Sequence, residues 1–238
     1  MSMSNHEYVM QIIRSLQNID YIRPGEIPNI DLYMDQVTTF MDEHLNASKR
    51  YPEDKLLTKT MINNYTKNQL LPPPNKKKYS KEHMLLLIFI YYFKNILSIS
   101  DIQSLFSPLT KRFYNSDKGI TLEQIYEEVF QMEKDQIDNL VKDVVKKYNK
   151  ASHTFESVED EGDQEFLQTF CFICMLSFDV YTKKMIIERL IDQTLSDIHK
   201  PSEREKGKGT EKAKDSEETK EAAPVKETNN ENDKIVKF

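Results

Sequence analysis

Residues 57–80 read LTKTMINNYTKNQLLPPPNKKKYS, and this stretch gathers the side chains of the chain best suited to binding chemistry. It is rich in amides, hydroxyls and lysines, and no acidic residue occurs between Lys55 and Lys81. A helix here would place four polar side chains on one face, namely Thr60, Asn63, Asn64 and Lys67. An asparagine amide can pair with adenine, while lysine and threonine reach phosphates or bases. The pattern predicts contact with nucleic acid; the alternative is a solvated polar face.

A stiff cationic projection is predicted directly after this helix. Three prolines at 72–74 favour extended backbone, and Lys76, Lys77 and Lys78 follow them. Adjacent ammonium groups suit contact with the nucleic-acid backbone or the minor groove. A lysine-rich solvated loop and a localisation patch are the alternatives.

The other reactive residues form no recognisable site. Cys171 and Cys174 make a C-x-x-C, but the large apolar residues around them indicate packing on a buried helix, not metal or redox chemistry. The five histidines show no metal-ligand spacing, and the sequence has no Gly-rich phosphate loop. We therefore expect no enzyme activity, no cofactor and no bound metal.

Charge is distributed unevenly along the 238 residues. The formal net charge is −6, yet residues 45–81 hold nine basic and two acidic residues, and residues 200–238 hold ten of each. Two cysteines provide no disulfide framework, which favours a reducing compartment. The N-terminus lacks signal-peptide features and the longest apolar run, 84–93, is too short to cross a bilayer. A cytoplasmic protein without membrane association, carrying a local basic region, is predicted.

Apolar residues at three-and-four spacing predict the helices that position the 57–80 stretch. A weak helical patch covers 8–16, and a clear amphipathic helix covers about 32–45. Thr58 is expected to cap a short helix whose Met61, Ile62 and Tyr65 face inward. Ser80 is expected to cap the next, in which residues 84–93 are apolar on all sides and therefore central and buried.

The rest of the chain is also predicted to be helical up to residue 198. Ser98 can cap a helix that ends near Pro108, with these side chains inward: Ile99, Ile102, Leu105 and Phe106. Residues 121–148 predict a long helix with a bend near 134–135, and residues 166–198 predict two further helices. Residues 199–238 hold almost no large apolar groups and should be disordered.

The order of several short motifs carries a resemblance. They are Ile62-Asn63-Asn64-Tyr65, Leu70-Leu71-Pro72, Tyr79-Ser80, Leu85 to Phe93, and Ser98-Ile99-Ser100-Asp101-Ile102. This order resembles the winged helix-turn-helix of the mercury-resistance-regulator (MerR) type. More narrowly, residues from 27 to about 110 resemble an uncharacterised bacterial domain-of-unknown-function family through the strings LYMDQV, LTKTMINNY and PPPNKKKYSKEH.

The resemblance implies an all-α protein with a MerR-like winged helix-turn-helix domain and double-stranded DNA as its partner. Asn63 takes the place of a usual Arg, and Tyr65 that of a phosphate-contacting Tyr. Gln69 stands where a Gly is usual, and the wing has prolines and lysines in place of Gly-Tyr-Arg. Together with the helical face, this gives the expected DNA-binding residues: Thr58, Lys59, Thr60, Asn63, Asn64, Tyr65, Lys67, Lys76, Lys77 and Lys78.

We expect the chain to have four parts, and we consider two alternative functions for it. The parts are an N-terminal extension (1–26), a winged helix-turn-helix-like domain (27–110), a helical region suited to dimerisation (111–198) and a disordered charged tail (199–238). The leading hypothesis is a DNA-binding transcriptional regulator acting as a homodimer. The alternative is a non-enzymatic protein-interaction module that kept the helix-turn-helix shape and lost DNA binding. The lysines of 76–78 discriminate between them, because a protein-binding scaffold has no need of them.

Overall fold

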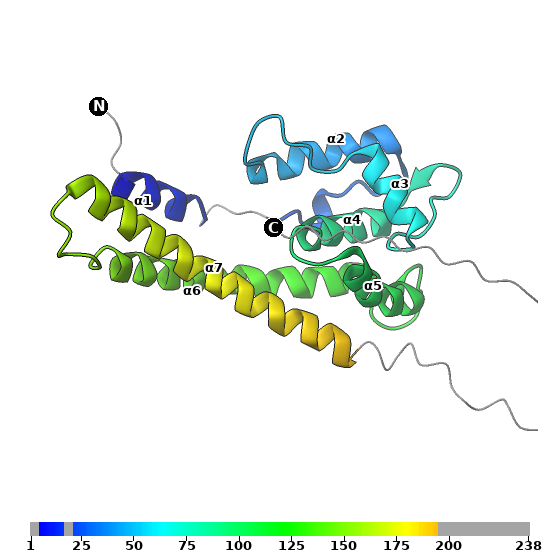
Figure 1. Ribbon diagram of the computed structural model, residues 1–238. Helices are drawn as coiled ribbons and strands as arrows, with labels where there is room; N and C mark the ends of the chain where they lie inside the picture. Colours follow the sequence, from blue (N-terminus) through cyan, green and yellow to red (C-terminus); the bar gives the residue numbers. More distant parts are fainter. Residues whose placement is uncertain (1–4, 17–20, 195–238) are drawn as a thin grey trace, which may run out of the picture. The chain divides into compact units, whose positions relative to one another are not determined.

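Helices make up most of the chain in the computed structural model, which describes residues 5–16 and 21–194 (Figure 1). In chain order the elements are α1 (Asn5–Leu16), η1 (Pro24–Glu26), β1 (Leu32–Tyr33), α2 (Met34–Leu45), η2 (Asn46–Ser48), α3 (Lys59–Lys67), β2 (Lys78–Tyr79), α4 (Lys81–Phe93), α5 (Ile99–Phe113), α6 (Leu122–Ala151) and α7 (Glu161–Thr194). The all-α prediction is confirmed. The predicted disordered tail, 199–238, lies outside the described residues.

The centre of the fold is α4, as its sequence predicts. Every residue from 83 to 91 is buried, so the helix has no solvent face over more than two turns. Apolar side chains of α2, α3, α5 and α6 join it in one core. A helix that is apolar on all sides is stable only when other helices surround it. The other helices therefore pack around α4.

Side-chain caps set where the helices begin. The Thr58 hydroxyl accepts a hydrogen bond from the Met61 amide at 3.2 Å, and Ser98 accepts one from the Asp101 amide at 3.2 Å. Thr121 caps α6 in the same way, through the Gln124 amide. Each cap satisfies a backbone donor that the first turn of a helix leaves unpaired. The predicted caps at Thr58 and Ser98 are confirmed.

A two-stranded antiparallel ribbon ties the segment before α2 to the segment before α4. Leu32 pairs with Tyr79 and Tyr33 with Lys78. Leu32 and Tyr79 are buried, whereas Tyr33 points outward and is half exposed. This pairing places the lysines at 76–78 next to the start of α2, a contact that spans over forty residues of sequence.

The predicted end of α5 near Pro108 is wrong, since the helix runs through Pro108 to Phe113. A proline removes one backbone hydrogen bond and costs about 3 kcal/mol in a helix interior. Here Phe106 and Leu109, on either side of it, pack against the core and hold the backbone helical. Ile99, predicted to face inward, is 51% exposed, because the first turn of α5 projects beyond the core.

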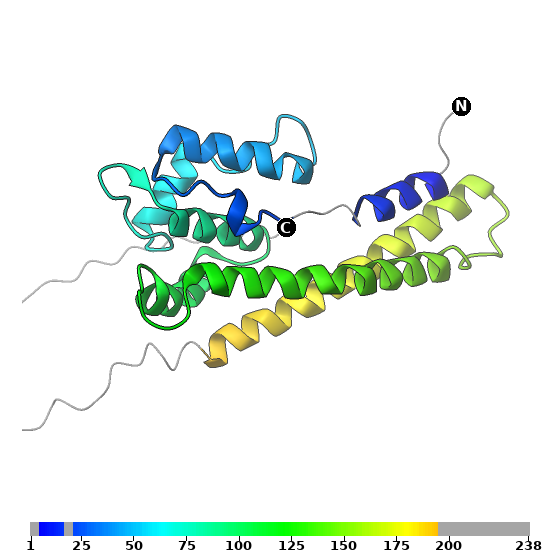
Figure 2. The same cartoon turned by 180° about the vertical axis from the view of Figure 1, so that it is seen from behind.

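The long C-terminal helices also differ from prediction. Residues 161–194 form one helix, α7, and not two, and α6 is continuous over its thirty residues. The two helices cross and contact each other (Figure 2), and the Lys147 ammonium bridges Asp143 on α6 and Asp179 on α7, the latter at 2.5 Å. The middle of α7 contacts α6 through Phe172 and Asp179, and Ile191 near its end joins the core, so both regions hold the single helix in place.

The core does not stop at residue 110. Leu122 and Tyr126, in the first turns of α6, are fully buried with α4. The Tyr126 hydroxyl donates to the Ile22 carbonyl at 2.7 Å, and its ring lies 5.2 Å from that of Phe89. The N-terminal part of α6 therefore completes the core around α4. Within the described residues, no helix combines the length and apolar character that crossing a membrane requires.

Candidate nucleic-acid interface

The polar face of α3 is exposed as predicted. Thr60, Asn63, Asn64 and Lys67 are all solvent-exposed, while Ile62 is fully buried on the opposite side. The short helix contributes no carboxylate of its own, so nothing on it repels a phosphate. Its outward surface offers a hydroxyl, two amides and an ammonium group.

Tyr65 belongs to the other side of α3. It is only 8% exposed and packs in the core, where burial raises the pKa of its hydroxyl. Of the ten residues expected to touch DNA, it is the one that the structure directs inward. Its ring anchors α3 to the core.

The end of α3 explains how a Gln can occupy a position where a Gly is usual. Gln69 has φ +58°, the left-handed conformation that favours glycine. The Leu70 amide donates to the Tyr65 carbonyl at 2.9 Å and the Gln69 amide to the Thr66 carbonyl at 3.1 Å. These two bonds are those of a Schellman motif, and Leu70 and Tyr65, at the positions where an apolar pair usually accompanies it, are both buried. The chain therefore turns without glycine, at a cost in backbone strain.

We predict that Gln69→Gly stabilises the fold. Left-handed backbone costs a side-chain-bearing residue about 1–2 kcal/mol, part of which glycine offsets by its greater freedom when unfolded. The expected gain is about 0.5–1 kcal/mol in the free energy of unfolding, measured by urea denaturation. Gln69→Ala is the matched control and should give no such gain; equal stabilisation by both would mean that the strain is absent.

The lysine projection is a tight two-residue turn. Lys76 and Lys77 both have positive φ, +48° and +65°, and the Lys78 amide donates to the Asn75 carbonyl at 2.9 Å. Two consecutive positive φ values are the signature of a type I′ hairpin turn, for which Asn-Gly is the preferred sequence. Both lysine side chains are exposed at the tip. Strained positions of this kind concentrate at functional sites.

Lys78 behaves differently from its two neighbours. It is half-buried, and its ammonium lies 5.1 Å from the centre of the Tyr33 ring, in cation–π geometry. Lys59 at the start of α3 is likewise engaged, in an exposed ion pair with Asp35. Tyr33 and Asp35 lie two residues apart at the start of α2, so the α3 face and the lysine turn meet there.

Tyr33 is the residue of this site that the sequence reasoning missed. It is an aromatic side chain about half exposed, at the N-cap of α2, and it holds one of the lysines. The available signal was the alternation at Leu32-Tyr33, which puts one residue inward and the next outward. The ion pair with Asp35 could not be read from sequence, because its partners are 24 residues apart and no periodicity links them.

His83 is a buried residue of α4 that contacts the segment before the lysine turn. It is 3% exposed, and the Ser80 amide donates to its Nδ1 at 3.0 Å. Its ring meets those of Tyr79 and Tyr114 edge-on, at 5.4 and 5.3 Å. Burial lowers the pKa of His83, although hydrogen bonds to the backbone of Pro73 and Pro72 oppose the shift. His83 thus joins α4 to the proline segment that precedes the lysines.

We predict a pH dependence of stability that originates at His83. Because its pKa is lower in the folded state, the unfolded chain takes up the proton first as the pH falls below about 6.5. The free energy of unfolding should then decrease with falling pH, by up to about 1.4 kcal/mol per pH unit, and level off below the folded-state pKa. Urea titrations from pH 7.5 to 5 measure this slope.

The substitution that isolates this effect is His83→Gln, since Gln is a usual residue at this capping position and retains an acceptor for Ser80. His83→Gln should flatten the slope, whereas His153→Gln, at an exposed histidine, should leave it unchanged. A wild-type slope in His83→Gln would assign the pH dependence to other groups.

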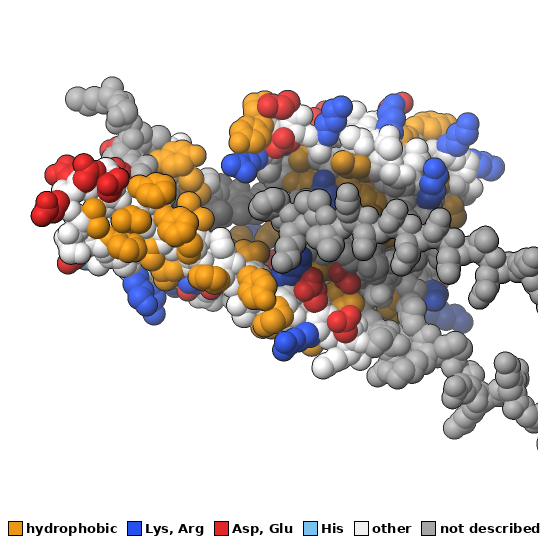
Figure 3. Space-filling model, viewed as in Figure 1, with side chains coloured by type: hydrophobic (Ala, Val, Ile, Leu, Met, Phe, Trp, Pro, Cys, Tyr) orange, Lys and Arg blue, Asp and Glu red, His pale blue; other side chains and the backbone are white. Residues whose placement is uncertain are grey.

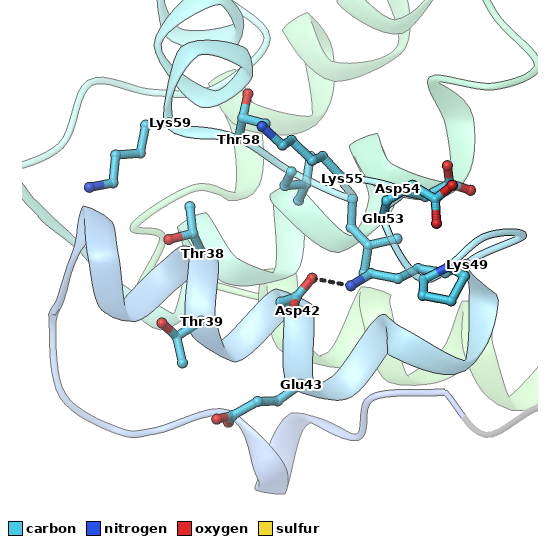
Figure 4. Close-up of a pocket in the computed structure, with 13 residues that line it drawn as sticks. Thr38, Thr39, Asp42, Glu43, Lys49, Glu53, Asp54, Lys55, Thr58 and Lys59 are labelled. Atoms are coloured by element: carbon cyan, nitrogen blue, oxygen red, sulfur yellow. Dashed lines mark ion pairs between the residues drawn. The ribbon is translucent and has the colours of Figure 1, made fainter.

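A groove of about 570 Å³ lies beside the start of α3 (Figure 4). It runs between α2 and the loop that leads to Thr58, and its lining mixes both charge signs. Lys49 pairs with Asp42 at 2.7 Å, and Glu43, Glu53 and Asp54 add further carboxylates. Lys55 and Lys59 also line the groove, so its charges nearly balance and it is less basic than the lysine turn.

The cysteine pair shows no sign of a metal site. Cys171 and Cys174 are free thiols, both half-buried on α7. Among the residues that the structure describes, no group of three His, Cys, Asp or Glu side chains could hold a metal ion.

Comparison with known proteins finds a family that is similar to the part of the chain around α4. The model of a family described as Domain of unknown function (DUF1836) matches residues 22–130. This part of the chain is similar to that family, whose function is unknown. The matched range begins at Ile22, whose carbonyl binds Tyr126, and ends at Phe130, whose ring lies 4.2 Å from that of Tyr126. The matched range thus covers most of the core around α4 and includes the first part of α6, while Ile191 of α7 adds to the core from outside it. No curated protein and no solved structure matches the chain.

Proposed function

We propose that this protein binds double-stranded DNA through α3 and the 75–78 turn, arranged as a MerR-like winged helix-turn-helix, and acts as a transcriptional regulator. The observation that carries the proposal is the pairing of two features at the start of α2. One is the exposed, carboxylate-free face of α3; the other is the strained turn with Lys76 and Lys77 at its tip.

The two features have different roles in this proposal. Asn63 and Asn64 enter the major groove and read base edges, since amides offer a donor and an acceptor side by side. Lys76 and Lys77 bind phosphates and supply affinity without sequence choice. Lys59 exchanges its exposed partner Asp35 for a phosphate, which is inexpensive because exposed ion pairs contribute only about 0–1 kcal/mol.

The helix-turn-helix in this proposal has an unusually long connection. Residues 46–58, including η2, separate α2 from α3, whereas such motifs usually have a turn of about three or four residues. The first helix, the second helix, the short strand pairing and the following buried helix nevertheless occur in the expected order. The second candidate function, a protein-interaction module, is favoured by the carboxylates around the groove beside α3.

We predict that Asn63→Ala weakens specific binding by about 1–3 kcal/mol and leaves non-specific binding nearly unchanged. Fluorescence anisotropy with duplexes from the upstream region of its own gene, and with a scrambled duplex, measures both affinities. Asn68→Ala is the control, because Asn68 is also an exposed amide but its side chain bonds to the Asn64 carbonyl at 2.8 Å. Equal weakening of Asn63→Ala on all sequences would contradict base reading. Absence of wild-type binding at low salt would favour the interaction module.

A further inference from the structure

An apolar stripe runs along the outer face of α7. Its members recur at helical spacing, and each keeps 54–68% of its surface exposed: Phe166, Phe170, Ile173, Phe178 and Tyr181. Figure 3 shows hydrophobic side chains gathered over this helix. We call these five residues the α7 stripe.

Contacts with α6 determine which face of α7 points outward. Phe172 is buried on the inner side with its ring 5.3 Å from that of Tyr148, and Asp179 binds Lys147 at 2.5 Å. These inward contacts leave the stripe facing outward. No other element among the described residues shields it from solvent.

The stripe is large for a surface that stays exposed to water. An aromatic side chain offers about 150–250 Å², so five large side chains, each more than half exposed, present roughly 500–600 Å². This lies at the upper end of the apolar patches found on monomers, about 300–600 Å². Two such surfaces facing each other would bury roughly 1,000–1,200 Å², close to the lower bound of stable interfaces.

Charges along α7 indicate which partner fits. Asp163 precedes the stripe and Lys184 follows it, each equally far from its midpoint between Ile173 and Cys174. If a second α7 packs antiparallel, Asp163 of each copy lies near Lys184 of the other. Lys184 pairs with Glu188 of its own helix, at 3.6 Å on the surface, and can exchange that partner at small cost. Residues 200–238 have few large apolar side chains and are poorly suited to cover the stripe.

We propose that two copies of this chain associate through the α7 stripe, antiparallel about a two-fold axis near Ile173 and Cys174. A two-fold interface uses the same patch on both copies, and an apolar centre with opposite charges at its two ends is self-complementary in that arrangement. Cys174 and Ser177, small residues beside the stripe, allow the helices to approach closely. The proposal does not depend on DNA binding.

Sedimentation equilibrium of the full chain tests the association. We expect a monomer–dimer equilibrium that Phe170→Glu shifts strongly, with a dissociation constant raised about 1,000-fold. A buried aromatic anchor is worth a large factor, and each substitution acts twice in a symmetric dimer. The matched control is Ile30→Glu, at an exposed apolar residue outside α7, and it should leave the equilibrium unchanged. Circular dichroism spectra establish that both variants are folded. A monomeric wild-type chain, or a Phe170→Glu dimer as tight as wild type, would overturn the proposal.

Thiol cross-linking tests the orientation. With Cys171→Ser, Cys174 is the sole cysteine, and diamide, which accepts the two thiol hydrogens as the disulfide forms, should link the two copies. Asp163→Cys in a background without Cys171 and Cys174 should not cross-link. In the antiparallel pair its two sulfurs are separated by about 31 Å, the length of helix from 163 to 184. Efficient cross-linking at position 163 would show parallel pairing and would refute the antiparallel arrangement.

Discussion

Replacing the two strained lysines, Lys76→Asn with Lys77→Gly, should abolish most of the DNA affinity and leave the fold intact. Each phosphate contact contributes a factor of about 8 at 0.1 M salt, so the loss of two weakens binding about 60-fold on every sequence. The slope of log affinity against log salt should fall in magnitude by about 2. Anisotropy titrations from 50 to 300 mM salt measure both quantities.

Replacement by Asn-Gly separates an effect on binding from an effect on stability. Asn-Gly is the preferred pair for the turn that Lys76 and Lys77 adopt, so stability should stay the same or rise. A loss of binding could not then be attributed to unfolding. Lys142→Gln with Lys146→Gln removes two exposed charges of α6 and is the control. Unchanged affinity and slope in the turn variant would exclude the lysine turn from the interface and favour the protein-interaction module.

The second large effect is a loss of stability at Tyr126, which tests whether the start of α6 belongs to the folded domain. Tyr126→Ala should lower the free energy of unfolding by about 3–5 kcal/mol, because it empties a fully buried aromatic site. The change also removes the hydroxyl that donates to the Ile22 carbonyl at 2.7 Å. Urea denaturation measures the loss. Tyr51→Ala, at an exposed tyrosine, should change stability by less than about 0.5 kcal/mol.

Tyr126→Phe separates the two contributions. It keeps the ring and leaves the buried carbonyl of Ile22 without its donor, a cost of about 1–3 kcal/mol. A small effect of Tyr126→Ala would mean that the domain folds without α6. The observed packing leads to the opposite expectation, that a fragment ending at residue 110 does not fold stably.

Local features of this site could be predicted from sequence, and features that depend on distant contacts could not. The exposed face of α3, its Thr58 cap and the buried α4 follow from periodicity and from single residue types close together in the chain. The contacts of Lys59 with Asp35 and of Lys78 with Tyr33 join separate elements, and no spacing rule encodes them.

The errors in the helices have the same origin. Pro108 is a local stop signal, but the apolar residues around it dock on the core and override it. Residues 166–198 were expected to form two helices, yet contacts with α6 and α5 accompany one long helix. In both cases a tertiary contact outweighed a local preference.

The positive φ angles of Lys76 and Lys77 have a consequence for the sequences of related domains. At these two positions the residues best for backbone stability, Asn and Gly, are not those best for holding a polyanion. Selection for a stable fold and selection for binding therefore act in opposite directions there. Relatives that bind DNA in this way should retain long cationic side chains at the tip, whereas relatives that do not bind DNA should drift toward Asn-Gly. The composition of this one turn would then indicate which related domains bind DNA in the proposed way.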